Sequence, residues 1–148
     1  MILSKDFREF LKLLNLNNVK YLLVGGYAVG LHGYPRYTKD IDIWIRISPE
    51  NAESITLALN QFGFGSLGLS KDDFLKEDAF VQLGYPPNRI DIIMNCSGVE
   101  FEECYKSKIV LGIDDIEINL IDLDNLRKNK LSSGRPQDLA DFDNLKKK

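Results

Sequence analysis

One segment constrains the fold of this chain more than any other. Residues 40–47 read DIDIWIRI, so that isoleucine fills every second position. Because successive side chains of a strand point to opposite faces, the segment predicts a β-strand with one apolar face and a second face that carries Asp40, Asp42, Trp44 and Arg46. Asp is a poor strand former, which indicates that something other than propensity places two of them here.

The two carboxylates of this strand are spaced so that they can act on one cation. Asp40 and Asp42 leave the same face, with Cα atoms about 6–7 Å apart. Mg²⁺ takes oxygen ligands, usually one or two carboxylates with waters and phosphates. Asp91 has the same apolar-Asp-apolar setting in another predicted strand, and the three together predict a site for two metal ions about 3.5–4 Å apart. The plainer interpretation is the solvated face of an amphipathic strand.

A pair of glycines precedes the carboxylates. Gly25 and Gly26 follow the short apolar segment 21–24 and come before a short predicted helix over 27–31. Glycine lets backbone N–H groups approach an anion closely, and a helix N-terminus adds a favourable potential. Alone the pair indicates a tight turn, but ahead of two carboxylates it predicts the phosphate side of a phosphate-and-metal site.

The order of these features resembles a known family. Residues 24–26 read VGG, residues 40–43 read DIDI and residues 90–92 read IDI. This series is similar to the signature of the DNA polymerase β-type nucleotidyltransferase superfamily. Two further segments, 36–42 (RYTKDID) and 126–141 (LRKNKLSSGRPQDLAD), resemble bacterial stand-alone members, including the abortive-infection toxin nucleotidyltransferases.

The resemblance implies the nucleotidyltransferase fold, a mixed α/β (α+β) architecture with a short mixed β-sheet flanked by helices, which binds a nucleoside triphosphate such as ATP and Mg²⁺, with Mn²⁺ as a substitute. Asp40 and Asp42 would bind the metals. Asp91 would share the catalytic metal and help to activate the attacking hydroxyl. Gly25 and Gly26 would hold the triphosphate through backbone amides. Many relatives have serine at the second glycine position, and Gly26 lacks that hydroxyl.

Four other side chains are candidates for phosphate contacts. Arg36 and Thr38 precede the carboxylate pair on a predicted loop, where they either contact phosphates or solvate the loop. Lys130 and Arg135 are predicted to add positive charge around the triphosphate, and the alternative is a basic helix end favoured by the dipole. Asp138 either orients one of these cations or lies in the first turn of the last helix, where acids are stabilised.

Composition sets the class of protein. The chain has 148 residues, which predicts a single domain over 1–148 with 122–148 as a short C-terminal helical segment. Net charge is −3, which argues against a protein coated in nucleic acid. Two cysteines exclude a disulfide framework. The N-terminal residues mix charges with apolar side chains, so we expect no signal peptide, no membrane contact and a cytoplasmic protein.

The remaining periodicities predict a series of elements. We expect Trp44 in the core rather than stacked on a base, His32 packed at the end of its helix, and Leu139 facing inward from the last helix. The predicted helices cover 7–14, 27–31, 49–62, 99–106, 123–130 and the residues from 136 onward, and the predicted strands cover 21–24, 40–47, 79–83, 89–94, 108–111 and 116–121.

Three functional hypotheses follow. The first is a Mg²⁺-dependent nucleotidyltransferase that moves a nucleoside monophosphate onto an acceptor, which the sequence leaves open between RNA, protein and small molecules. The second is a non-catalytic interaction protein with the same fold, such as a toxin–antitoxin partner. The third is a nucleic-acid-binding module, against which the acidic balance counts. Because the chain is short, a homodimer or a partner chain is a further hypothesis for the missing wall of the active site.

Overall fold

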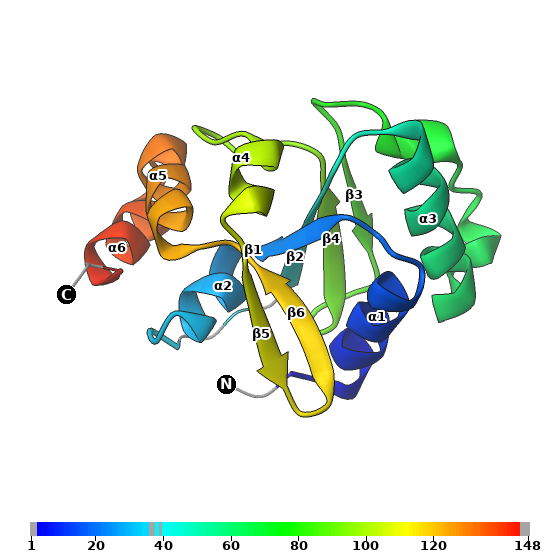
Figure 1. The fold of residues 1–148 in the computed structure, drawn as a ribbon, viewed down its shortest axis with the longest axis horizontal. Helices are drawn as coiled ribbons and strands as arrows, with labels where there is room; N and C mark the ends of the chain where they lie inside the picture. Colours follow the sequence, from blue (N-terminus) through cyan, green and yellow to red (C-terminus); the bar gives the residue numbers. More distant parts are fainter. Residues whose placement is uncertain (1–2, 36–37, 39, 146–148) are drawn as a thin grey trace.

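The computed structural model describes residues 3–35, 38 and 40–145. Its centre is a six-stranded mixed sheet in the order β3-β4-β2-β1-β6-β5 (Figure 1). The strands are β1 (Tyr21–Val24), β2 (Asp40–Ile45), β3 (Phe80–Leu83), β4 (Arg89–Ile93), β5 (Ile109–Ile113) and β6 (Ile116–Leu120). β2 pairs in parallel with β4 and antiparallel with β1, while β1 pairs in parallel with β6. The edge strands β3 and β5 pair antiparallel with β4 and β6.

Helices cover both faces of this sheet. They are α1 (Lys5–Leu16), α2 (Gly25–Leu31), α3 (Pro49–Leu59), α4 (Phe101–Lys106), α5 (Leu123–Ser133) and α6 (Pro136–Asn144). Figure 1 shows α1 and α3 on one side, and α2, α4 and the packed pair α5–α6 on the other. Three short helical turns, η1 (Asn60–Phe64), η2 (Gly65–Leu67) and η3 (Lys71–Phe74), connect α3 to β3. The predicted mixed α/β architecture with a helix-flanked sheet is confirmed. None of the helices in the described ranges combines the length and the apolar composition needed to cross a membrane.

The first helix forms as its sequence predicts. The Ser4 hydroxyl accepts a hydrogen bond from the backbone N–H of Phe7 at 3.1 Å, which caps the helix N-terminus. The four apolar side chains of its inward face, Phe7, Phe10, Leu11 and Leu14, are fully buried. Spacing of three and four residues thus places one face of α1 in the core.

The isoleucine-rich strand ends earlier than predicted. β2 stops at Ile45, and Ile47 is exposed instead of continuing the apolar face. The reason is Asn51, whose side-chain amide donates to the carbonyls of Lys20 at 3.0 Å and Arg46 at 2.9 Å. This side chain takes the place of further strand pairing, and Ser48 then caps α3 through the N–H of Asn51.

Two aromatic side chains near the carboxylate strand and the glycine turn have structural roles. Trp44 is buried and packs edge-to-face on Phe101 of α4, with ring centroids 5.2 Å apart, which confirms the core prediction. His32 follows the last residue of α2, and its Nε2 lies 2.7 Å from the carbonyl oxygen of Ile121. Its predicted packing at the helix end is therefore also confirmed.

The C-terminal helices differ from the predicted pattern. α5 continues three residues beyond Lys130 to Ser133, and Gly134 ends it in the left-handed region at φ 70°. Leu139 of α6, expected to face inward, is 41% exposed. The buried positions of this helix are instead Asp138 and Asp141, because a buried lysine of α5 lies opposite them.

Candidate functional site

The pairing of β2 with β4 brings the predicted carboxylates together. In the parallel register Asp42 lies beside Asp91, and Asp40 lies beside Arg89. Residues opposite each other on neighbouring strands share a face and are about 4.8 Å apart. The three aspartates and the arginine therefore form a two-by-two set on the sheet face that α2 and α4 cover.

The carboxyl group of Asp42 is held in an unfavourable setting for a charge. Its pKa is raised to about 7, mainly by burial and next by the negative charge of Asp91, while the nearby ammonium of Lys130 acts to lower it. A hydrogen bond with Asp91 and the charge of Asp40 add to the increase. The positive charge of Lys130 therefore does not offset the burial of Asp42 and the negative charges of the neighbouring aspartates.

Arg89 lies between the other two carboxylates and was not among the predicted site residues. Its guanidinium donates from Nη2 to Asp40 Oδ2 at 2.5 Å and from Nε to Asp91 Oδ1 at 3.0 Å. A third hydrogen bond runs from Nη2 to Asp91 Oδ2 at 3.1 Å. The two-residue spacing from Asp91 places Arg89 on the same face and was the available signal, but its partner Asp40 depends on strand pairing.

Gly25 is in close contact with Asp42. The glycine has φ +71°, and a Cβ built on it would lie 2.0 Å from Asp42 Oδ2. An L side chain is strained at this φ and has no space here. Gly25 and Gly26 are the first two residues of α2, which begins two positions earlier than predicted. The carboxylate strand and the glycine turn are thus in direct contact.

A pocket of about 510 Å³ adjoins this contact. Five predicted site residues line it, namely Gly25, Gly26, Asp42, Lys130 and Arg135. Its other polar lining residues, which sequence reasoning missed, include Asn95, Ser97, Asn129, Ser133 and Gln137. These come from the end of β4 and from the α5–α6 pair, so nothing in their own sequence context marks them. The pocket therefore joins the glycine turn to the basic C-terminal segment.

Two solved structures resemble this one. A candidate nucleotidyltransferase from Thermotoga maritima is 17% identical with a TM-score of 0.61, over 93% of this chain and 88% of that chain. An antigenic nucleotidyltransferase-like protein from Paracoccidioides brasiliensis is 18% identical with a TM-score of 0.57, over 97% and 77%. No family model and no curated protein matches the sequence. This chain has the nucleotidyltransferase fold.

Within the nucleotidyltransferase fold of this chain, Lys130 is held by two acids of α6. Its Nζ lies 3.3 Å from Asp138 Oδ1 and 3.3 Å from Asp141 Oδ2, and its side chain is only 6% exposed. The predicted phosphate contact of Lys130 therefore competes with two short ion pairs. Asp138 pairs with both Lys130 and Arg135 and also lies in the first turn of α6, so both predicted alternatives for this residue hold.

Arg135 is placed differently. Its Nε donates to Asp138 Oδ2 at 2.7 Å, yet its side chain is 79% exposed at the rim of the pocket. Burial alone would raise the pKa of Asp138, but the hydrogen bond from Arg135 and the charge of Lys130 bring it below its usual value. The anchored and exposed guanidinium keeps donors available for a phosphate group.

One of the two loop candidates, Thr38, lies within the described residues. Thr38 hydrogen-bonds the hydroxyl of Tyr27 in α2, and burial raises the pKa of that tyrosine. Thr38 therefore ties the segment before β2 to the helix of the glycine turn. Arg36, the other predicted loop contact, lies outside the described residues.

Asp40, Asp42 and Asp91 are ligands of the kind that Mg²⁺ prefers, because carboxylates offer hard oxygen atoms. The positive charge near Asp42 is also too small to offset burial and the neighbouring carboxylates. In the described part of the chain, however, no three His, Cys, Asp or Glu side chains are arranged as a ready metal-binding group. The guanidinium of Arg89 instead contacts oxygens of both Asp40 and Asp91. The residue types fit a Mg²⁺ site, but their arrangement in this structure is that of an arginine-paired cluster.

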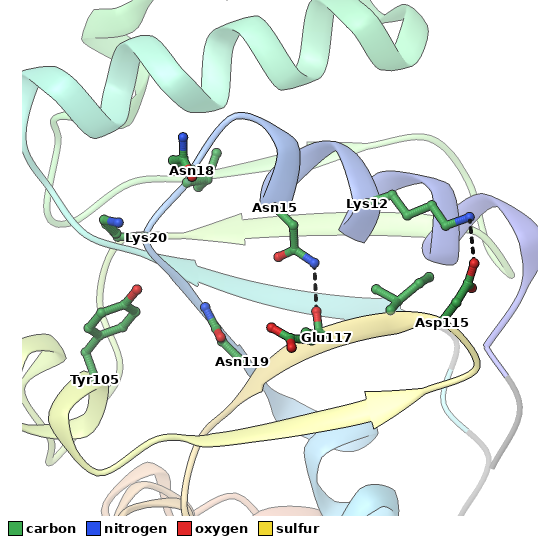
Figure 2. Close-up of a pocket in the computed structure, with 10 residues that line it drawn as sticks. Lys12, Asn15, Asn18, Lys20, Tyr105, Asp115, Glu117 and Asn119 are labelled. Atoms are coloured by element: carbon green, nitrogen blue, oxygen red, sulfur yellow. Dashed lines mark hydrogen bonds and ion pairs between the residues drawn. The ribbon is translucent and has the colours of Figure 1, made fainter.

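A second pocket, of about 440 Å³, lies at the opposite end of β1 (Figure 2). Lys12 faces Asp115 across 4.0 Å, and the Asn15 side chain donates to the carbonyl of Glu117 at 2.7 Å. The charged side chain of Lys12 thus already has a partner of opposite charge at this pocket. None of the predicted site residues lines this pocket, so the first pocket is the candidate functional site.

Proposed function

We propose that this protein is a Mg²⁺-dependent nucleotidyltransferase, which also accepts Mn²⁺. It would transfer a nucleoside monophosphate from a nucleoside triphosphate to an acceptor hydroxyl and release pyrophosphate. The observation that supports this most directly is the placement of Asp40, Asp42 and Asp91 on neighbouring strands, beside a pocket bounded by Gly25 and Gly26. Carboxylates next to a glycine turn combine the metal and phosphate parts of one site.

The carboxylates carry the chemistry in this proposal. Asp40 and Asp42 would hold the metals, and Asp91 would share one of them. Bound Mg²⁺ supplies positive charge that offsets the triphosphate and the charge developing at the α-phosphoryl group. Asp91 accepts the proton of the acceptor hydroxyl, whose oxygen bonds to the α-phosphorus while the bond to pyrophosphate breaks.

The pocket supplies the remaining contacts. The backbone amides of Gly25 and Gly26 are proposed to bind the triphosphate, because both residues line the pocket and neither has a side chain of its own to keep a phosphate away. Arg135 adds a guanidinium at the rim, where its exposure allows it to reach a phosphate. Lys130 contributes charge from beneath the pocket while it stays bound to its two aspartates.

The proposal is tested by transfer of label. The purified protein is incubated with Mg²⁺ and each α-³²P-labelled nucleoside triphosphate, against pools of RNA, protein and small molecules, and labelled products are separated. We expect one pool to take up label and Asp42→Asn to lose the transfer. Asp115→Asn, an exposed change at the second pocket, is the matched control and should leave transfer unchanged. Unchanged transfer by Asp42→Asn would exclude the assigned site.

One observation favours a second function, that of a non-catalytic interaction protein such as a toxin–antitoxin partner. Arg89 bridges two of the three carboxylates, which would leave a stable, metal-free cluster if the site were inactive. Calorimetric titration with Mg²⁺ and each nucleoside triphosphate separates the two functions. Binding supports the transferase, and absence of binding by the folded protein supports the interaction role.

A further inference from the structure

Arg89 occupies the centre of the carboxylate cluster. It is the first residue of β4, and its guanidinium uses three hydrogen bonds to contact one oxygen of Asp40 and both oxygens of Asp91. We propose that Arg89 is a built-in cation that holds the cluster in the metal-free protein, and that it must turn away before a metal can bind. The inference rests on the proposed function, because it takes these carboxylates as metal ligands.

Charge is the first argument. The cluster can carry three negative charges, and Arg89 supplies one positive charge at hydrogen-bonding distance from two of its members. A divalent cation on the same oxygens would lie close to the guanidinium and be repelled by it, most strongly in a partly buried site. The two cations therefore exclude each other from the cluster.

Mobility is the second argument. The side chain of Arg89 is 30% exposed and begins its strand directly after the loop over 84–88, so it has a path to solvent. Lys130, the other cation near Asp42, is 6% exposed and held by two aspartates of α6. Of these two cations, Arg89 is the more exposed, although its departure breaks the ion pair with the buried Asp91.

Metal binding to variants provides the test. Free Mn²⁺ is measured by electron paramagnetic resonance during titration of the wild-type protein, Arg89→Met and Arg89→Lys. We expect Arg89→Met to bind Mn²⁺ about tenfold more tightly, because a competing positive charge is gone. Arg89→Lys, which keeps the charge, should stay close to wild type. Circular dichroism establishes that each variant is folded.

Arg46→Met is the matched control. Arg46 also has a 30% exposed side chain and a two-point ion pair, with Glu102, but it lies outside the carboxylate cluster. Its Mn²⁺ affinity should equal that of wild type. If wild type binds Mn²⁺ and folded Arg89→Met binds equally or more weakly, the inference is overturned and the proposed function stands. If no folded form binds Mn²⁺, both fail.

A second measurement follows metal binding by the wild-type protein, so that it does not depend on the folding of Arg89→Met. The arginine Nε–H resonances are followed by ¹⁵N nuclear magnetic resonance during addition of Mg²⁺, with Arg89→Lys to assign the signal. We expect the Arg89 signal to change with the same midpoint as metal binding. A signal that stays unchanged at saturating Mg²⁺ would overturn the inference.

Discussion

Gly25 and Asp42 approach each other so closely that a single added carbon on the glycine would lie 2.0 Å from a carboxylate oxygen. The contact joins α2 to β2, and both residues line the pocket. Because Gly25 also has a positive φ, two separate physical reasons require glycine there. One is the left-handed backbone conformation, and the other is the lack of space for a Cβ atom beside Asp42.

These two reasons can be separated by a pair of variants. Gly68 has the same φ of +71°, but a Cβ there meets nothing within 4 Å. Gly68→Ala should therefore cost about 1 kcal/mol of unfolding free energy from backbone strain alone. Gly25→Ala should cost about 3 kcal/mol or more, because Asp42 must also move. Urea unfolding measures both, and equal costs would show that the space beside Asp42 is unimportant.

The raised pKa of Asp42 predicts a pH-dependent stability. In the folded protein the pKa of this carboxyl is about 7, whereas its ordinary value in an unfolded chain is 3.8. Between these values the folded state binds more protons than the unfolded state, so the free energy of unfolding falls as pH rises. Without metal, Asp42→Asn should remove this slope and be more stable than wild type at pH 8 by roughly 2 kcal/mol.

The measurement is urea unfolding in EDTA at pH 5 and pH 8. Wild type should lose stability between the two values relative to Asp42→Asn. Asp115→Asn, which removes an exposed carboxylate elsewhere, serves as the comparison and should keep the wild-type slope. A parallel pH dependence in wild type and Asp42→Asn would contradict the assigned environment.

The sequence predicted the local parts of this fold well. Alternation in residues 40–47 identified the strand and the shared face of Asp40 and Asp42, and β1 has the predicted bounds. These features depend on side-chain period, which neighbouring residues determine. The position of Asp91 beside Asp42, and of Arg89 beside Asp40, follows from parallel pairing of strands far apart in the chain. No local pattern specifies that register.

The buried carboxylates of α6 also depend on contacts that local sequence patterns do not specify. Periodicity predicted Leu139 to face inward, but Asp138 and Asp141 are the buried positions. Hydrophobic patterns assume that charged side chains stay in water. A lysine from another helix changes the outcome, because it pairs both carboxylates inside the protein. Sequence spacing does not reveal which distant residue will provide that partner.

Lys130 should therefore be a stability residue. Removing its ammonium leaves Asp138 and Asp141 as buried carboxylates that have each lost a short ion pair, while Asp138 keeps its pair with Arg135. Lys130→Met should lower the unfolding free energy by about 3–5 kcal/mol. Lys128→Met changes an exposed lysine of the same helix and should stay within about 0.5 kcal/mol of wild type.

Thermal and urea unfolding of these variants give the comparison. The combined variant Lys130→Met, Asp138→Asn, Asp141→Asn should recover much of the loss, because no uncompensated charge remains buried. A loss below about 1 kcal/mol in Lys130→Met would show that water already screens the pair.

Arg135, in contrast to Lys130, should matter little for stability but should contribute to nucleotide binding. Its side chain is 79% exposed, so its ion pair with Asp138 contributes less than about 1 kcal/mol. Its guanidinium lies at the rim of the pocket, where the proposed function places phosphate groups. Arg135→Met should therefore unfold close to wild type but bind nucleoside triphosphate with Mg²⁺ about tenfold more weakly, because a charge-assisted contact is lost.

Arg8→Met removes an exposed ion pair with Asp114 at a site that does not line the pocket, and its affinity should not change. If calorimetry gives Arg135→Met and Arg8→Met the same affinity, Arg135 does not contact the triphosphate, and its role is limited to capping the charge of Asp138.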